Sequence, residues 1–206
     1  MHDTAPKGPD HEGLFHVAAA QGGYFTAAQA RQRGFSRALL AHHAGAGGRF
    51  VRIRRGLYRF RQYPTSPRED VLAAWLAANP GVAVISHESA LDLLQLSDVV
   101  PEAVHLTVPR AGRYRPRSPG VRVHTTTRDL APGDVVIRDG MRMTSAGRSI
   151  LDAAEAGMAP EQVIAAVHQA LDRGMTAERQ LRAAAEERSG RVERLVTRAL
   201  TERRSS

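Results

Sequence analysis

The sequence lacks cysteine altogether, and Lys7 is its only lysine. Without cysteine the chain has no disulfide and no thiolate metal site, which agrees with a reducing, cytoplasmic setting. No apolar run approaches the roughly 20 residues that a membrane-spanning helix needs. The polar residues 1–10 also lack the apolar core of a signal peptide. We therefore expect a cytoplasmic globular protein that makes no contact with a membrane.

Acidic residues are missing from the 56-residue stretch 13–68, which still contains ten arginines. Residues 1–65 contain ten Lys and Arg against three Asp and Glu, a net charge of +7. The other 19 basic and 18 acidic residues leave +1 for residues 66–206, so nearly all of the net charge of +8 lies in the N-terminal third. A one-sided positive field favours a polyanionic partner, and double-stranded DNA is the first candidate.

Three short helices are expected in this basic third. The first ends at Gly22-Gly23. Thr26 is a good N-cap for an alanine-rich helix over 27–33, Gly34 ends that helix, and Ser36 caps the third. The second and third helices are thus separated by only about three residues, which is the spacing of a helix-turn-helix.

A hairpin is expected directly after these helices. Two β-prone runs, Phe50–Arg54 and Leu57–Phe60, are joined at Arg55-Gly56. Arginine alternates with apolar residues in these runs, so one face can pack while the other presents a row of guanidinium groups. Three helices followed by a basic hairpin predict a winged helix-turn-helix.

The remainder of the chain predicts an α+β domain, a small sheet surrounded by helices. Residues 1–12 are expected to be disordered, 13–63 to form the winged helix-turn-helix, and 68–206 to form this C-terminal domain after a short linker. The expected strands cover about 82–85, 104–108, 121–125 and 135–144, with a turn at Asp139-Gly140. The expected helices cover about 68–79, 86–96, 145–156, 160–173, 176–188 and 191–203.

Enzymatic sites are not indicated. His87, His105 and His124 are expected in or near the sheet, but they lack the paired carboxylates or the His-x-x-x-His helix that accompany many metal sites. Ser86, His87 and Glu88 are not expected to form a triad, because neighbours at a helix start do not face each other as nucleophile and base. Ser86 is instead expected to be an N-cap. We therefore expect no catalytic residue, no metal ligand and no cofactor.

Motifs spread over about residues 14–170 resemble one known family. In the basic third they are Phe25-Thr26-x-x-Gln29-Ala30, Gly34-Phe35-Ser36 and Gly48-Arg49-Phe50-x-Arg52-x-x-Arg55-Gly56-x-Tyr58. In the second part they are Ile85–Ala90, Val104–Pro109, Gly120–His124 and Gly140-Met141-Arg142-Met143-Thr144-Ser145-x-x-Arg148-Ser149-Ile150-Leu151-Asp152. Together these segments resemble AbiEi-type antitoxins, which are paired with nucleotidyltransferase (AbiEii-type) toxins in the toxin–antitoxin systems often called type IV.

The resemblance implies a winged-helix DNA-binding domain, a C-terminal domain that carries antitoxicity, and repression of the toxin–antitoxin promoter through inverted repeats. The expected partners are therefore promoter DNA and a nucleotidyltransferase toxin. A plain winged-helix regulator, whose C-terminal domain senses a ligand or only oligomerises, is one alternative. A nucleic-acid-cleaving enzyme using residues around His87, Glu88 and His124 is another.

The DNA contacts are expected on the third helix and on the hairpin. On the helix, Ser36, Arg37 and His42 face a base-reading position, while Arg33 meets phosphate. Before and within the hairpin, arginines are expected at the backbone or in the minor groove: Arg49, Arg52, Arg54, Arg55 and Arg59. A second basic cluster follows in a loop, and it is a second DNA contact, a toxin contact or a solvated loop: Arg110, Arg113, Arg115 and Arg117.

Overall fold

The computed structural model describes residues 8–65, 67–110, 119–126 and 130–205. The chain divides into two compact units, Met1–Pro80 and Gly81–Ser206. Within the described residues, none of the helices is long and apolar enough to cross a membrane.

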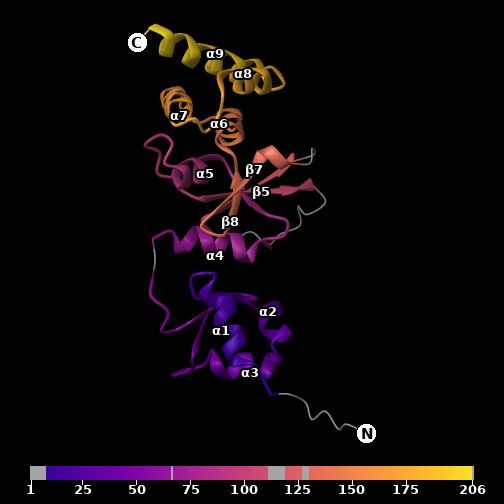
Figure 1. Cartoon of the computed structure of the whole chain (residues 1–206). Coiled ribbons are helices and arrows are strands. Elements are labelled where there is room, and N and C mark those ends of the chain that lie inside the picture. Colours follow the sequence, from indigo (N-terminus) through magenta and orange to yellow (C-terminus); the bar gives the residue numbers. More distant parts are fainter. Residues whose placement is uncertain (1–7, 66, 111–118, 127–129, 206) are drawn as a thin grey trace. The chain divides into compact units, whose positions relative to one another are not determined.

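The first unit is a winged helix. Its elements follow in the order α1 (His11–Ala19), β1 (Tyr24–Thr26), α2 (Ala27–Gln32), α3 (Arg37–His43), β2 (Phe50–Arg54), β3 (Leu57–Phe60) and α4 (Glu69–Ala77). The three strands form an antiparallel sheet in the order β1-β3-β2, and α1, α2 and α3 are its helical part (Figure 1). The predicted helix-turn-helix and hairpin are therefore confirmed.

The ends of α2 and α3 follow from local side-chain chemistry. Thr26 and Gln29 form a capping box, in which the Thr26 hydroxyl accepts from the Gln29 N–H at 3.2 Å and Gln29 Oε1 accepts from the Thr26 N–H at 2.8 Å. The Ser36 hydroxyl accepts from the Leu39 N–H at 3.1 Å. Gly34 lies between the helices at a φ of +81°, a left-handed conformation that costs glycine little. These contacts fix the short turn of the helix-turn-helix.

An apolar core holds the three helices on the sheet. Its buried members are Leu14, Ala18, Phe25, Ala30, Phe35, Leu40, Phe50 and Phe60. Tyr58 packs against this core and stacks on Phe25 with ring centroids 5.8 Å apart. Tyr58 therefore packs against the core instead of facing solvent.

Strand β1 and the start of α1 differ from the sequence-based expectation. No strand was expected at residues 24–26, where only Thr26 was assigned, as an N-cap, whereas these residues pair with β3 along Tyr24↔Arg59 to Thr26↔Leu57. Helix α1 begins at His11, and the Asp10 carboxylate accepts from the Gly13 N–H at 2.8 Å. The described part of the segment expected to be disordered, residues 8–12, therefore leads into and begins a capped helix.

Helix α4 also lies elsewhere than expected. It was assigned to the C-terminal domain, but the division between the units falls after Pro80. Glu69 at its start pairs with Arg59 of β3 at 2.9 Å, and its Leu72 side chain lies against Gly22. These contacts join the helix to the small sheet, which sequence periodicity cannot indicate.

The second unit is a five-stranded mixed sheet with helices, as predicted. Its sheet has the order β6-β5-β4-β8-β7, in which β4 pairs in parallel with β8 and β5 with β6. The elements are β4 (Val84–Ile85), α5 (His87–Leu94), β5 (Val104–Pro109), β6 (Val121–Thr126), the 3-10 turn η2 (Pro132–Asp134), β7 (Val135–Arg138), β8 (Met141–Thr144), α6 (Ala146–Glu155), α7 (Pro160–Asp172), α8 (Glu178–Glu186) and α9 (Gly190–Ser205).

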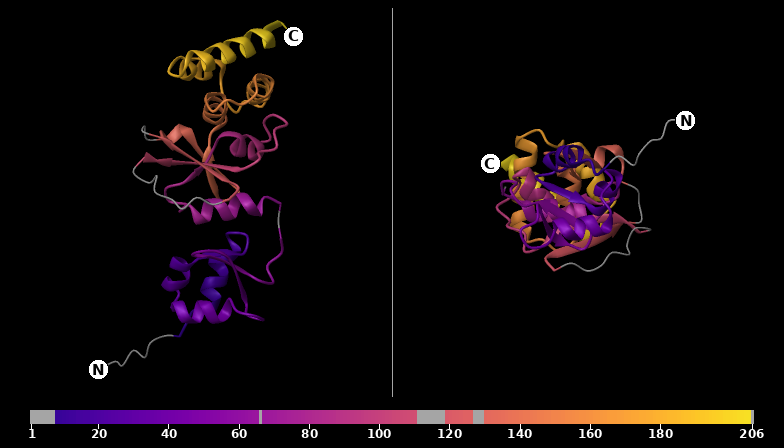
Figure 2. Two further views of the ribbon diagram at one scale, coloured as in Figure 1. Left: turned by 180° about the vertical axis from the view of Figure 1, so that it is seen from behind. Right: turned by 90° about the horizontal axis from the view of Figure 1, so that it is seen from below.

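Helices α5 to α9 complete the second unit. Helix α5 contacts β5, β8 and α6, and α9 packs on α7 and α8. Figures 1 and 2 show α6 between the sheet and the α8–α9 pair. The expected turn at Asp139-Gly140 joins β7 to β8 with positive φ at both residues, the conformation of a two-residue hairpin turn.

Candidate functional site

The outer side of α3 is exposed and free of acidic residues. Leu40 of this helix is buried and Leu39 packs against the core, whereas Arg37, Ala41 and His42 are exposed. Ser36 is exposed too, but its hydroxyl caps the helix. Arg37 and Ala41 are one turn apart, so the helix presents a basic side chain, a small one and an imidazole. This arrangement fits a recognition helix.

The hairpin presents two fully exposed arginines. Arg52 and Arg55 are exposed, and Arg54 is half-buried. The register shifts between Arg52 and Arg54, which leaves Ile53 as an extra residue with 38% of its surface exposed. A bulge of this kind breaks the alternation of faces. The expected row of guanidinium groups is therefore interrupted: Arg52 is exposed in the middle of β2 and Arg55 in the turn.

Arg59 is a structural residue, and its assignment as a DNA contact is corrected. It is 8% exposed, and its Nη2 donates to the carbonyls of Tyr63 and Pro64 and to Glu69 Oε1 at 2.7, 2.9 and 2.9 Å. Its guanidinium also lies 5.6 Å from the ring centroid of Tyr24. A cation with these partners ties the hairpin to α4 and cannot reach a phosphate outside.

Arg33 and Arg49 are exposed but have partners within the unit. Arg33 Nη1 lies 3.4 Å from Asp10 Oδ2, and Arg49 Nη1 lies 3.4 Å from His11 Nδ1. Exposed pairs of this length add little to the stability of the fold. A DNA phosphate can therefore take the place of Asp10 beside Arg33, or of His11 beside Arg49. Burial, with His11, His42 and Arg49 nearby, lowers the pKa of His43, so that this imidazole next to the exposed face is neutral at pH 7.

The second basic cluster is described only at its first member. Arg110 is exposed directly after β5. Arg113, Arg115 and Arg117 lie outside the described residues, so their expected role stays a prediction.

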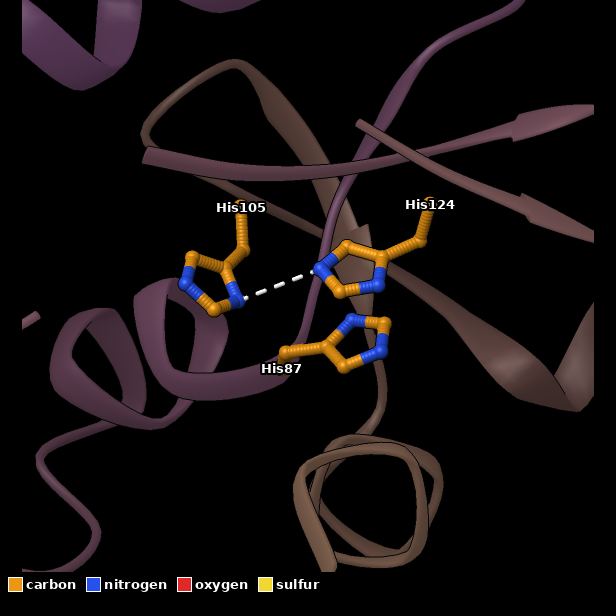
Figure 3. A group of neighbouring side chains, drawn as sticks. All are labelled: His87, His105 and His124. Carbon is orange, nitrogen blue, oxygen red and sulfur yellow. Dashed lines mark hydrogen bonds between the residues drawn. The ribbon is translucent and has the colours of Figure 1, made fainter. Parts of the chain in front are cut away.

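Three histidines that the sequence analysis set aside come together in the second unit. His87 begins α5, His105 lies in β5 and His124 in β6, and one ring nitrogen of each lies within 4.8 Å of the others (Figure 3). His105 Nδ1 and His124 Nε2 are 3.3 Å apart, and the rings of His87 and His124 stack with centroids 3.6 Å apart. No sequence motif marks this cluster, because its members are far apart in the chain.

All three imidazoles are neutral at pH 7. Burial lowers the pKa of His87 to about 2, with smaller effects of His124, His105 and two arginines. Burial and the nearby His124 lower the pKa of His105 to about 4. The pKa of His124 is also lowered, first by burial and then by Arg122.

Ser86 and His87 have a geometry that the sequence analysis judged impossible. Ser86 Oγ lies 2.9 Å from His87 Nδ1 and accepts from Thr107 Oγ1 at 2.7 Å. His87 has a φ of +53°, a left-handed conformation that is uncommon for a residue other than glycine. Ser86 therefore stands at the N-cap position without capping the helix through its side chain, and it is fully buried rather than placed as a nucleophile.

A cavity of about 790 Å³ adjoins the histidines. His87 and His124 line it, together with the carboxylates of Asp134, Asp152, Glu155 and Glu187 and the guanidinium groups of Arg148 and Arg188. Asp152 joins both arginines, with Arg148 Nε and Arg188 Nη2 each 2.8 Å from its oxygens. The cavity wall is thus built by paired charges from α6 and the segment after α8.

The comparisons with known proteins identify the basic unit. Residues 13–61 match the family model described as a transcriptional regulator, AbiEi antitoxin. This stretch is similar to AbiEi antitoxin regulators, and it is called the AbiEi domain below. The expected resemblance to AbiEi-type antitoxins is confirmed over residues 13–61, from within α1 to just after β3, and the match does not extend to the motifs expected between residues 85 and 152.

A solved structure has a similar fold over most of the chain. The crystal structure of the RV2827C protein from Mycobacterium tuberculosis matches with a TM-score of 0.60 and 16% identity, over 91% of this chain and 74% of that one. At this identity the likeness concerns the fold alone. No curated protein matches the chain.

The matched residues bear on the broad class of function. Their family model describes antitoxin transcriptional regulators, which supports a DNA-binding antitoxin. The exposed side chains of α3 and of the hairpin tip lie within the matched residues, whereas the histidine cluster lies outside them.

Proposed function

We propose that this protein represses its own toxin–antitoxin promoter in the cytoplasm and neutralises a nucleotidyltransferase toxin of the AbiEii type. The first unit binds inverted repeats in the promoter through α3 and the hairpin. The second unit acts on the toxin. The observation that carries the proposal is an AbiEi domain whose α3 and hairpin tip expose arginines in a stretch without acidic residues.

Charge and exposure support the proposed DNA contacts. Arg37, Arg52 and Arg55 are exposed. The described part of the first unit has four acidic residues, and three of them are in ion pairs within the unit: Asp10 with Arg33, Glu12 with His16 and Glu69 with Arg59. An electrostatic footprint with so few acidic neighbours suits a phosphate backbone.

Arg37 and Arg55 separate base reading from phosphate contact. Arg37→Ala should weaken binding to the operator by about 1–3 kcal/mol and relax its sequence preference. Arg55→Ala should weaken binding to operator and random DNA alike, and should reduce the log–log salt slope by about 0.9. Fluorescence anisotropy on both DNAs measures this. Equal losses on both DNAs for Arg37→Ala would show that α3 does not read bases.

The full chain carrying both substitutions separates repression from antitoxicity. Arg37→Ala combined with Arg55→Ala should release a promoter fusion while cells expressing the toxin still grow. Growth rescue and promoter activity are recorded in the same strains, with a nucleotidyltransferase encoded next to this chain expressed as the toxin. If no such gene lies beside it, the toxin assignment is refuted. Loss of rescue in a folded double variant would place antitoxicity in the AbiEi domain.

A second candidate function is supported by the cavity of the second unit. A space of about 790 Å³ lined by paired charges is large enough for a small ligand. In that case the protein is a winged-helix regulator whose second unit senses the ligand. A chain that represses the promoter, fails to rescue cells from any neighbouring toxin and responds to a small molecule would favour this candidate.

A further inference from the structure

The histidine cluster is built by the sheet rather than by a local motif. In the parallel pair β5–β6, Thr107 lies opposite His124. His105 precedes Thr107 by two residues, so His105 and His124 lie on the same face of the sheet. Helix α5 contacts β5 and supplies His87 at its first position (Figure 3). Three elements thus direct one imidazole each toward a common point.

The distances come close to those of a three-histidine metal site. Nitrogens bound at about 2.0–2.1 Å to a tetrahedral ion are roughly 3.3–3.4 Å apart. His105 Nδ1 and His124 Nε2 already have this separation, at 3.3 Å. The widest separation between ring nitrogens of the cluster is 4.8 Å at most. To bind one ion these nitrogens have to come closer, which requires the His87 ring to tilt out of its stack on His124. Such a tilt is a side-chain rotation that leaves the sheet in place.

We propose that His87, His105 and His124 form a binding site for one divalent transition metal ion of the zinc class. Imidazole nitrogen is a preferred ligand of Zn²⁺ and its neighbours in the first transition row. The absence of cysteine excludes thiolate sites and leaves imidazole sites open. The proposal does not rest on the proposed DNA binding, because the cluster lies outside the AbiEi domain.

The surroundings favour a cation despite the basic chain. Among the described residues, the cavity beside the histidines is lined by four carboxylates and two guanidinium groups, a formal charge of −2, and Arg122 near His105 and His124 reduces this to −1. Arg148 and Arg188, the arginines near His87, are both paired with Asp152 at 2.8 Å, and Arg148 also with Asp134 at 3.0 Å. Their charges are therefore compensated within the cavity wall.

The backbone at His87 also points to a functional site. His87 is held in a left-handed conformation that is uncommon for a non-glycine residue, and such residues accumulate at functional sites.

Three protein ligands leave a fourth position open. Two of the three histidines line the cavity, so that position faces it. A zinc ion with three protein ligands and an open fourth position takes water or an oxygen ligand there. The site therefore offers the second unit a place to bind a small anionic ligand through the metal.

Metal titration of the full-length chain tests the proposal. The protein, without an affinity tag, is stripped with chelator and titrated with Co²⁺ near neutral pH. We expect one equivalent with the intense visible absorption of four-coordinate Co²⁺, which Zn²⁺ displaces. In His124→Gln and His87→Gln the affinity for Co²⁺ should fall by more than about 100-fold. The loss of a residue that only hydrogen-bonds to a metal ligand usually costs less than this. The matched control is His168→Gln, since His168 belongs to the same unit and contacts the Ala199 carbonyl instead.

A second measurement uses the unaltered chain and therefore does not depend on whether the histidine variants fold. In protein with ¹⁵N-labelled histidine, Zn²⁺ should shift the ring signals of three of the nine histidines. The proposal is overturned if the unaltered chain binds no stoichiometric metal, if binding survives in both His87→Gln and His124→Gln, or if the shifted signals belong to other histidines. The cluster is then a set of stacked core imidazoles.

Discussion

Replacement of Arg59 should destabilise the first unit and leave its DNA affinity nearly unchanged. Arg59 lies in the basic hairpin, where its charge alone suggests a DNA contact. Its guanidinium is instead buried against Glu69 and two carbonyl groups. The substitution Arg59→Ala removes one partner of a buried ion pair, and Arg59→Lys keeps the charge.

The expected magnitude follows from the partners that are left behind. Breaking a buried pair by removing one partner costs about 3–5 kcal/mol. Glu69 keeps 25% of its side chain exposed, and Pro64 is exposed. In Arg59→Ala, water can therefore solvate part of the Glu69 carboxylate and the Pro64 carbonyl. We therefore expect a loss of about 2–4 kcal/mol for Arg59→Ala, using roughly 1.5–3 kcal/mol for a hydrogen bond to a charged group.

The lysine variant should lose much less. All three acceptors of Arg59 are bound through Nη2, and within the described residues Nε is buried without a hydrogen-bond partner. A lysine ammonium has three donors at one nitrogen and no group equivalent to Nε. Arg59→Lys should therefore cost about 1 kcal/mol, near the net contribution of one ordinary hydrogen bond.

Trp75 provides the assay. It is the sole tryptophan, it is buried, and it lies in α4 of the first unit, so its emission in a urea titration reports unfolding of that unit. Arg52→Ala, an exposed arginine of the same hairpin, is the control for loss of charge alone. The reasoning is refuted if Arg59→Ala matches the unaltered chain in stability and binds DNA as weakly as Arg52→Ala.

Two further substitutions probe the turn of the helix-turn-helix and the cavity wall. Gly34→Ala should destabilise the first unit by about 1 kcal/mol, because a Cβ disfavours the φ of +81°; Trp75 emission in urea measures it, and an unchanged midpoint would contradict it. Asp152→Ala should destabilise the second unit by roughly 3–5 kcal/mol, because it leaves Arg148 and Arg188 without their shared carboxylate. Because the second unit has no tryptophan, its unfolding is followed by calorimetry of the full chain. Unfolding transitions at the same temperatures as in the unaltered chain would refute the assigned role of Asp152.

The winged helix was predictable because its signals are local. Thr26, Ser36 and Gly34 each act on residues within a few positions, and the structure places them as capping and turn residues. The hairpin likewise follows from alternation around Gly56. The three-residue strand β1 was missed, since a run this short carries too little periodicity to stand out from the start of α2.

The contacts that were missed connect distant parts of the chain. Arg59 was assigned to the DNA face because hairpin alternation places it among other arginines, and only the fold shows Glu69 beside it. The histidine cluster likewise depends on the pairing of β5 with β6 and on the position of α5. The Ser86–His87 contact depends on a left-handed residue that no sequence rule assigns to histidine at a helix start.

The salt dependence of binding to promoter DNA tests the central claim most directly. The full chain is titrated onto DNA from upstream of its own gene, and onto random DNA, over a series of salt concentrations. If Arg37, Arg49, Arg52, Arg54 and Arg55 each neutralise one phosphate, the log–log slope should be about −4.5 per chain at 0.9 per contact. Promoter DNA should bind more tightly than random DNA at every salt concentration. Binding that does not depend on salt, or that is equal on the two DNAs, would contradict the claim that α3 and the hairpin read an operator.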